Sequence, residues 1–485
     1  MRIYEEGLRY ARWLQPGHGA DGLYLDYNAT TPVDPAVFAA LSPFLQERFG
    51  NPSSKHAVGV DAAGALRAAR EAAAAALGAP PCSITFTSGA TESINWALKS
   101  GAKLKRLKGP SPGRIVTCAM EHPAVLRVCE YLRDEEGFEL ILCPVLSSGL
   151  IDLGAFEALL TADVRPLIVV ALCVQTILIS IPLANGEVGV VQPIREVVSV
   201  ARRICPDALI HADASQAMGK VAVQPVSLGV DLLTVAGHKV YAPKGVGALY
   251  IREGINLPPL VLGGGQESGL RGGTENVAYI VGLAKALELV QQSWAAPEWP
   301  CTQQQIAAAA AAASSNELDS SEANQAKEAG ALAAHPPHPS KLAFTAKVFV
   351  EAFWAALEQD TKSSRQLLAA AVRFNGPLGA ADAQVQQQWL PGTIHLSIWG
   401  ASGFEIANAL AEEERLFVSA GVSCHQCKTA SGTLLAMGHP DEWAVGSLRI
   451  SVGRWTSPFE AADAARRVVK LLVSHQLLQR EGVPN

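Results

Sequence analysis

Short runs of β-branched and aliphatic residues recur through the middle of the chain, separated by helix-like stretches. Six of them lie between residues 84 and 251: ITFT, RIVTCAM, LIVVAL, ALIHAD, DLLTVA and GALYI. Continuous apolar runs are typical of strands that are buried on both faces of a sheet. Their alternation with helices predicts an α/β large domain, over residues 33–292, with a mostly parallel sheet covered by helices.

The pattern of the chain changes after residue 292. Residues 293–340 are rich in Ala, Gln, Ser and Pro, which predicts a poorly ordered insertion with a transient helix over Ala307–Ala313. Beyond it, KVFVEAFWAALEQD and PFEAADAARRVVKLLVSHQLL have helical patterns, and TIHLSI and SLRISVG read as strands. We expect a smaller α+β domain over residues 341–485, with residues 1–32 as an N-terminal segment that packs with it.

One apolar run is long enough to raise the question of a membrane span. The stretch PLIVVALCVQTILISIPLANG, residues 166–186, contains no charged residue. Gln175, Thr176, Ser180 and Pro182 interrupt it, however, and a buried parallel strand also reads as a continuous apolar run. We therefore expect a strand here and no membrane partner.

Composition narrows the classes of function. The 485 residues carry a net charge of −6 and are 49% hydrophobic, so the chain can bury a large core but lacks the basic surface that nucleic acids attract. Nine cysteines spread mostly through apolar stretches suit reduced thiols in an intracellular protein. The N-terminus resembles no secretory signal. These features favour a cytoplasmic protein that acts on small molecules.

Residues that could bind a ligand or take part in catalysis follow the predicted strands. Open α/β sheets form their ligand crevices at these positions. The SGAT turn after ITFT presents backbone N–H groups and a helix N-terminus that suit a phosphate. His122 follows RIVTCAM, Asp213 ends ALIHAD with Gln216 one turn later, and Lys239 follows DLLTVAGH. Taken singly, each has an ordinary structural explanation, such as an N-cap or a solvated surface lysine.

Taken together, these residues supply what a pyridoxal phosphate site requires. The site needs an anchor for the phosphate, a face for the ring, a carboxylate for the pyridinium nitrogen and an amine for covalent attachment. The sequence therefore predicts pyridoxal phosphate as the cofactor.

Nine motifs occur in an order that resembles the cysteine desulfurase and selenocysteine lyase group of class V aminotransferases. They are LYLDYNATTPVDPAV, GNPSSKHAVG, FTSGATES, EHPAV, HADASQAMGK, AGHKVYAPKGVGALYIR, GGGQESGLRGGTENV, SAGVSCHQ and SLRISVGR. The likeness covers most of the chain outside the insertion. It implies a fold-type I pyridoxal phosphate enzyme with a seven-stranded type of sheet, and active sites completed across a homodimer.

The resemblance also implies roles for single residues. Lys239 would hold the cofactor and later move the Cα proton, Asp213 would keep the ring nitrogen protonated, and His122 would stack on the ring. The remaining cofactor-binding residues would be Gln216 at the phenolic oxygen, Asn185, and, around the phosphate, Ala90, Thr91, His238 and Thr274 of the partner subunit. Arg449 would pair with the substrate carboxylate, with Asn28 as a second substrate-binding residue.

Cys424 lies where this group keeps the cysteine that takes sulfur or selenium from the substrate and leaves L-alanine. Two other interpretations of its loop stay open. Cys424 and Cys427 form one C-x-x-C, but the sequence offers no second ligand pair at the usual spacing, so we expect no metal ion. A disulfide between Cys424 and Cys427 would inactivate the enzyme on oxidation.

The choice within the group depends on few residues. His425 directly after Cys424, together with DYNATTP, GGGQE and RGGTEN, looks more like selenocysteine lyases. We expect release of selenide from L-selenocysteine, with an acceptor protein for the selenium or sulfur. The alternative is a cysteine desulfurase that delivers persulfide sulfur from L-cysteine.

Two departures from the group keep other functions open. The group's NNE reads NGE here, so Gly186 replaces an Asn that normally contacts cofactor and substrate, and Ala236 replaces a phosphate-binding Ser. The stretch CVQTILISIP, from Cys173 to Pro182, precedes NGE and is also longer than the connection in the group. A catalytically weak scaffold remains an alternative, as does an ordinary aminotransferase, which would not need Cys424.

Overall fold

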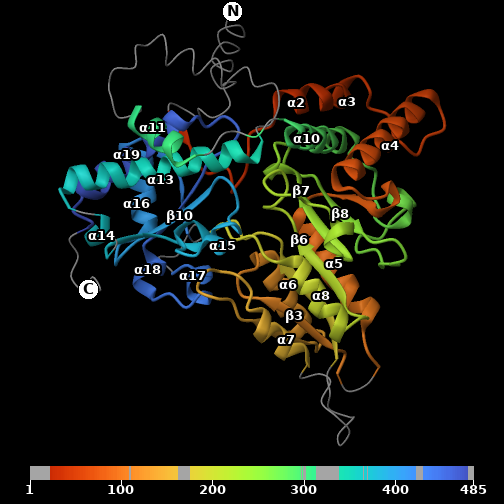
Figure 1. Cartoon of the computed structure of the whole chain (residues 1–485). Coiled ribbons are helices and arrows are strands. Elements are labelled where there is room, and N and C mark those ends of the chain that lie inside the picture. The colour runs from red at the N-terminus through yellow and green to blue at the C-terminus, as the bar shows by residue number, and fades with distance from the viewer. Residues whose placement is uncertain are drawn as a thin grey trace, which may run out of the picture. The chain divides into compact units, whose positions relative to one another are not determined.

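The structure, a computed structural model, divides into two compact units, each visible in Figure 1. The large unit contains residues 33–185 and 190–291, and the small unit contains residues up to 32, residues 186–189 and residues from 292 onward. The residues that the structure describes are 22–108, 111–161, 175–296, 298, 302–312, 338–363, 365–368, 370–421 and 430–478.

The large unit is built on a seven-stranded sheet in the order β2-β8-β7-β6-β5-β3-β4. Its strands are β2 (Ile84–Thr87), β3 (Arg114–Cys118), β4 (Glu139–Cys143), β5 (Thr176–Pro182), β6 (Leu209–Asp213), β7 (Leu232–Ala236) and β8 (Gly247–Ile251). Within this sheet β8 alone runs antiparallel to its neighbours. The carboxyl ends of the other six strands therefore lie along one edge, and the expected α/β class with a mostly parallel sheet is confirmed.

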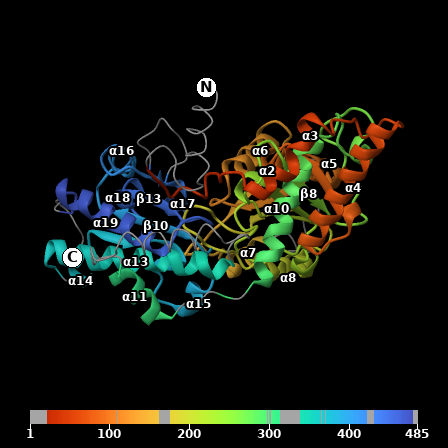
Figure 2. The same ribbon diagram turned by 90° about the horizontal axis from the view of Figure 1, so that it is seen from above.

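Helices pack on this sheet through apolar faces. The helices are α2 (Pro35–Leu41), α3 (Pro43–Gln46), α4 (Ala57–Leu77), α5 (Ala90–Lys105), α6 (Pro123–Asp134), α7 (Leu153–Thr161), α8 (Ile194–Ile204), α9 (Pro225–Leu228) and most of α10 (Val277–Ala295). Ile94 and Leu98 of α5 and Val125 of α6 join Ile115 and Leu178 of the strands in one buried cluster. Figure 2 shows α10 beside α2, where a Cβ at Gly282 would lie 2.9 Å from Leu41 Cδ2.

The long apolar run contains a buried strand, as expected. All seven residues of β5 are buried, which explains why the run carries no alternation of polar residues. Residues 162–174, which include the LIVVAL run, lie outside the described residues. Among the residues that are described, no helix is both long and apolar enough to cross a membrane.

The small unit joins an antiparallel sheet to two long helices. Its strands are β9 (Val372–Phe374), β10 (Thr393–Ile398), β12 (Ser419–Ala420) and β13 (Ser447–Ser451), in the order β12-β13-β10-β9, with β1 (Leu23–Tyr24) paired to β11 (Leu416–Phe417). Its helices are α11 (Gln303–Ala312), α13 (Pro339–Thr361), α14 (Arg365–Leu368), α15 (Ala383–Gln386), α16 (Gly403–Glu413), α17 (Gly432–Ala436), α18 (Asp441–Val445) and α19 (Pro458–Ser474).

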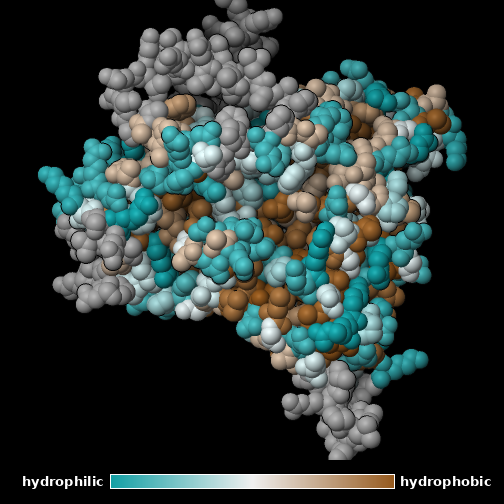
Figure 3. Space-filling view, in the orientation of Figure 1, coloured by the Kyte–Doolittle hydropathy of each residue, from teal (hydrophilic) through white to brown (hydrophobic). Residues whose placement is uncertain are grey.

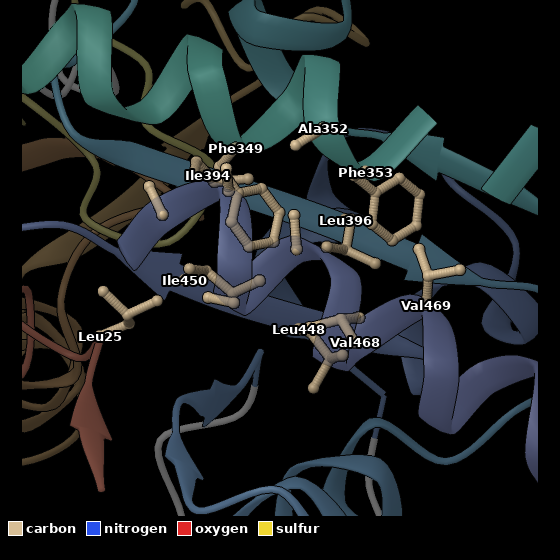
Figure 4. Packing of buried hydrophobic residues seen from close by; sticks show 14 of the residues in the cluster. Leu25, Phe349, Ala352, Phe353, Ile394, Leu396, Leu448, Ile450, Val468 and Val469 are labelled. Atoms are coloured by element: carbon tan, nitrogen blue, oxygen red, sulfur yellow. The ribbon is translucent and has the colours of Figure 1, made fainter. Parts of the chain in front are cut away.

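The core of the small unit lies between the sheet and these long helices. Figure 4 shows Phe349 and Phe353 of α13 above Leu396 of β10, with Leu448 of β13 and Val468 of α19 nearby. The strands predicted at TIHLSI and SLRISVG and both amphipathic helices are present, because their apolar positions face this core.

The structure differs from the expected poorly ordered insertion over residues 293–340. The helix α11 occupies Gln303–Ala312, and Ile306 and Ala310 on it are buried in the core of the small unit. These two residues are four apart and so share one face of a helix. A single isoleucine in a run of alanines carries too weak a periodic signal to predict this packing. Residues 313–337 lie outside the described residues.

Phe353→Ala should lower the free energy of unfolding of the small unit by about 3–5 kcal/mol. The Phe353 side chain is fully buried, and its ring packs edge-on against Trp354 and Phe374. Denaturant unfolding followed by tryptophan fluorescence measures the loss. Phe404→Ala on α16 is the control, because Phe404 is exposed, and it should cost less than about 1 kcal/mol. Equal losses in both variants would contradict the assigned core.

Candidate active site

Three sequence-predicted residues meet at the carboxyl edge of the large-unit sheet. Asp213 is the last residue of β6, Lys239 ends the 3-10 turn η3 (Gly237–Lys239) that follows β7, and His122 follows β3. His122 Nδ1 accepts the N–H of Ala124 at 3.1 Å, which caps α6 and fixes the ring. The pKa of His122 is lowered by desolvation and by the charge of Lys239, while Asp213 opposes the shift. The three groups therefore act on one another electrostatically.

His238 lies in the same turn as Lys239. Desolvation lowers the pKa of His238 to about 4, and the positive charges of Lys239 and Lys244, together with His122, push it the same way. At neutral pH the imidazole is therefore uncharged and presents one N–H donor and one acceptor nitrogen.

The turn between β2 and α5 has the form of an anion-binding site. Ala90 and Thr91 are the first residues of α5, so their N–H groups cannot bond to carbonyls within the helix. A Cβ at Gly247 would lie 2.8 Å from the Cα of Gly89, so only glycine fits at position 247 where β8 approaches this turn. The N–H of Ser88 donates to Glu92 Oε2 at 2.9 Å, which holds the turn in place. Backbone donors at a helix N-terminus suit a phosphate.

The remaining large-unit candidates lie nearby with different surroundings. Gln216 follows Asp213 by three residues and is partly buried. Asn185 Nδ2 donates to the carbonyl of Met120 at 3.0 Å, so the Asn185 side chain supports the segment that leads into His122. Thr274 is exposed.

The sequence did not reveal a buried network of polar side chains that lies behind these residues. Ser180 Oγ lies 3.2 Å from Glu121 Oε1 and 2.9 Å from His211 Nδ1, and His211 Nε2 lies 2.9 Å from Thr234 Oγ1. The signal was present in part, since His211 precedes Asp213 by two residues and so shares its face of β6.

The small unit brings together the two candidate substrate residues, Arg449 and Asn28. The guanidinium of Arg449 donates from Nη2 to Asp26 Oδ1 at 2.8 Å and from Nη1 to the carbonyl of Gly186 at 3.4 Å. Asn28 Nδ2 donates to the same carbonyl at 3.0 Å and to Thr393 Oγ1 at 2.9 Å. Arg449 Nε is buried and has no hydrogen-bond partner among the described residues, so it is suited to a carboxylate ligand.

A second carboxylate in the small unit, Glu187, also escaped prediction. Ser431 donates a short hydrogen bond to Glu187 Oε1, and Thr433 donates to Oε2 at 2.7 Å. A Cβ at Gly421 would lie 3.2 Å from Glu187 Oε1. Glu187 thus contacts the chain on both sides of residues 422–429.

Cys424, His425 and Cys427 lie outside the described residues, so the structure gives no position for the expected cysteine. In the part of the chain that is described, no group of three His, Cys, Asp or Glu residues could hold a metal ion. The described cysteines are all free thiols: Cys82, Cys118, Cys129, Cys143 and Cys205.

Comparison with known proteins decides the family. Residues 23–333 match the family model described as aminotransferase class-V. The chain belongs to the class-V aminotransferase family. Within it, a cysteine desulfurase IscS of Clostridium botulinum is 32% identical over 432 residues, which is 89% of each chain. The IscS of Dictyoglomus turgidum is 46% identical over 267 residues, 55% of this chain and 63% of the relative, so this match spans less than two thirds of the relative's length.

Solved structures of the same kind cover almost the whole chain. A NifS-like protein superimposes with a TM-score of 0.70 at 30% identity, over 93% of this chain and all of the other. A structure titled SspA in complex with cysteine gives a TM-score of 0.62 at 29% identity, over 90% of this chain and 99% of the other. These matches confirm the expected fold-type I architecture.

The class-V aminotransferase family depends on pyridoxal phosphate, and the residues at the large-unit edge fit this cofactor. The β2–α5 turn offers backbone donors for the phosphate, and Asp213 is a largely buried carboxylate whose Oδ1 accepts the N–H of Ser215 at 2.9 Å. Lys239 and His122 lie close enough to share their electrostatic fields. The cofactor would supply an electron sink for a carbanion at the substrate Cα.

His238→Gln should weaken pyridoxal phosphate binding less than His238→Ala, by about threefold against about tenfold, because the amide keeps an uncharged N–H donor. Both ratios should be the same at about pH 6 and about pH 8, since the pKa of His238 lies near 4 and protonation begins only below this range. Absorbance titration of the apoprotein with the cofactor measures them. A defect in His238→Ala that grows as the pH falls toward 6 would indicate a charged imidazole and contradict this assignment.

Proposed function

We propose that this chain is a cysteine desulfurase, which converts L-cysteine to L-alanine and leaves the sulfur as a persulfide on Cys424. The observation that carries the proposal is the convergence of Lys239, Asp213 and His122 at one edge of the sheet. Support comes from the relatives, several of which are named cysteine desulfurases.

The residues of the large unit would bind the cofactor and move protons. Lys239 would hold the cofactor through its amine and would move the proton of the substrate Cα. Asp213 would bind the ring nitrogen and keep it protonated. His122, whose ring is held by its cap on α6, would pack against the ring of the cofactor.

The residues of the small unit would bind the substrate and take its sulfur. Arg449 binds the substrate carboxylate, with Asp26 orienting the guanidinium and Asn28 beside it. The thiolate of Cys424 attacks the substrate sulfur, so an S–S bond forms while the Cβ–S bond breaks. The electron pair of that bond stays with the carbon chain, which takes up a proton and leaves as alanine. No external oxidant or reductant is needed.

The selenocysteine lyase that the sequence favoured is now the second candidate. Its support is His425 directly after Cys424 and the wording of three motifs. The names of the relatives favour the desulfurase instead. The cytoplasmic location and the acceptor protein remain predictions.

Alanine formation from L-cysteine and from L-selenocysteine, measured side by side, tests the proposal. We expect turnover of cysteine with a persulfide on the Cys424 peptide by mass spectrometry. Cys424→Ala should lower cysteine turnover by roughly 100-fold or more, and Lys239→Ala should lower both activities by at least about 1,000-fold. Cys82→Ala and Lys103→Ala are the controls, because both side chains are exposed, and they should retain activity.

Other results would identify the other candidates. Alanine from selenocysteine alone would indicate a selenocysteine lyase, and a keto-acid product unaffected by Cys424→Ala would indicate an aminotransferase. A protein that binds no pyridoxal phosphate would be a scaffold.

We also propose that the large unit forms a homodimer, in which Thr274 of the partner subunit completes the phosphate site. Phe49 and Leu262 expose 72% and 81% of their surface. Phe38, Leu45 and Val58 on α2 to α4 are exposed as well. Figure 3 shows tan and brown surface over the part that Figure 1 labels α3 and α4. Large exposed apolar side chains on successive helices, such as those on α2 to α4, are typical of an interface.

Phe49→Asp should convert the dimer to a monomer and weaken pyridoxal phosphate binding by about tenfold or more, because a buried charge disrupts an apolar interface and removes the partner's contribution. Light scattering after gel filtration measures the mass. Val226→Asp is the matched control, since Val226 on α9 is 57% exposed and lies outside this region. A wild-type monomer that binds the cofactor fully would contradict the proposal.

A further inference from the structure

Glu121, next to His122, is a buried carboxyl group with little to stabilise a charge. Only 5% of its surface is exposed. Its Oε1 lies 3.2 Å from Ser180 Oγ, and its Oε2 is buried with no hydrogen-bond partner among the described residues. No lysine or arginine in the described part of the chain forms an ion pair with it. An ionised carboxylate in this setting would be strongly destabilising.

Glu267 shows how the same large unit treats a carboxylate that is ionised. It is 7% exposed, yet both of its oxygens accept from the guanidinium of Arg70, at 2.6 and 2.8 Å. The N–H of Phe86 donates to it as well, at 2.9 Å. Two carboxyl groups of similar burial therefore differ in whether a cation is present.

Ser180 connects Glu121 to His211 on β6 and through it to Thr234 on β7. Ser180 and His211 are register partners, as are Asp213 and Thr234, so the chain of contacts crosses three neighbouring strands directly behind Asp213. Burial lowers the pKa of His211 to about 4, so its ring is neutral at pH 7. A neutral imidazole donates at one nitrogen and accepts at the other.

A proton on Glu121 Oε1, the oxygen that contacts Ser180, sets the direction of every hydrogen bond in this chain. When Glu121 is protonated, its O–H donates to Ser180, Ser180 donates to His211 Nδ1, and the Nε2–H of His211 donates to Thr234. Each of these three protons then has an acceptor. When Glu121 is ionised, the directions reverse and His211 carries its proton on Nδ1. The charge is then favoured only by Ser180 and by the backbone N–H of His122, and Oε2 has no hydrogen-bond partner among the described residues.

We propose that Glu121 is a positioning residue of the cofactor site, which stays protonated at neutral pH and closes an uncharged chain through Ser180, His211 and Thr234 behind Asp213. This inference deepens the proposed function and rests on the cofactor site in it. Burial, and then the negative charge of Asp213, both raise the pKa of Glu121, in agreement with the geometry. Asp213 is then the one negative charge available to the ring nitrogen from this group, and it keeps a fixed orientation.

Infrared spectroscopy of the apoprotein tests the protonation directly. With ¹³C-labelled glutamate, the carbonyl band of a protonated carboxylic acid should be present at neutral pH and should lose the Glu121 component in Glu121→Gln. Glu267→Gln is the matched control, and it should leave that component unchanged because Glu267 is ionised beside Arg70. A spectrum in which Glu121→Gln removes only carboxylate absorbance would overturn the proposal.

Two further measurements separate a positioning role from a purely structural one. Nitrogen NMR of labelled histidine should show the Nε2–H form of His211, and the Nδ1–H form would overturn the proposal. Glu121→Leu should weaken pyridoxal phosphate binding by about tenfold and Glu121→Gln by about threefold, because the amide can still donate to Ser180. Equal loss in both variants would mean that the proton on Glu121 is irrelevant to the site.

The infrared and NMR measurements need neither cofactor nor substrate, so they remain informative whatever reaction the enzyme performs. Failure of desulfurase activity with a protonated Glu121 would reject the proposed function alone. Activity with an ionised Glu121 would reject this inference alone.

Discussion

Parallel pairing of β3, β5, β6 and β7 is the constraint on which the rest of the candidate site depends. Because these strands run in one direction, whatever follows each of them is delivered to the same edge of the sheet. His122, Asp213 and Lys239 are more than 100 residues apart at their extremes, yet they act on one another electrostatically there. The order β2-β8-β7 extends the edge to the turn at Ala90 and Thr91, since the antiparallel β8 restores the direction of β2. A phosphate-binding turn and an amine thus come to one side without any local sequence signal that links them.

In the small unit, a backbone carbonyl brings the candidate substrate-binding residues together. Asn28 and Arg449, both candidates for binding substrate, donate to the carbonyl of Gly186. The replacement of an asparagine by Gly186 removes a side-chain amide but leaves this carbonyl in place, so the departure from the family wording does not disturb the hydrogen bonds that orient the two residues. Glu187 adds its contacts with Ser431 and Thr433 on the C-terminal side of the segment that carries Cys424. Residues 186–189 therefore supply the small unit with two groups, the backbone carbonyl of Gly186 and the carboxylate of Glu187.

The sequence predicted the parts of the fold and site whose signals are local. β2, β3, β6, β7 and β8 are short runs rich in apolar residues, and His122, Asp213 and Lys239 lie at or just after the ends of β3, β6 and β7. β4 was missed because it lies at the edge of the sheet and four of its five residues are incompletely buried, which weakens its apolar pattern. A helix over Ala307–Ala313 was expected only as a transient one, and the packing of α11 into the core was not predicted because its buried face consists of Ile306 and alanines. The pairing of Asp26 with Arg449 joins residues 423 positions apart, and no spacing rule reaches so far. Glu121, Ser180 and Thr234 read as ordinary polar residues until the register of the strands places them in one row.

The large unit neutralises its buried titratable side chains in more than one way. The way in which Glu121 is neutralised affects the electrostatic field around Asp213. Glu267 keeps its charge because Arg70 neutralises it, whereas His211 loses its proton to burial. Glu121 has neither a cation nor solvent, so a proton is the remaining means of neutralisation. Were it ionised, a second negative charge would lie near Asp213, and the two carboxylates would compete for the protons of the site. With Glu121 neutral, the field at the edge of the sheet comes from Asp213 and Lys239 with little competition. A single carboxylate held against an uncharged, fully hydrogen-bonded row is the arrangement best suited to keeping one proton on a ring nitrogen.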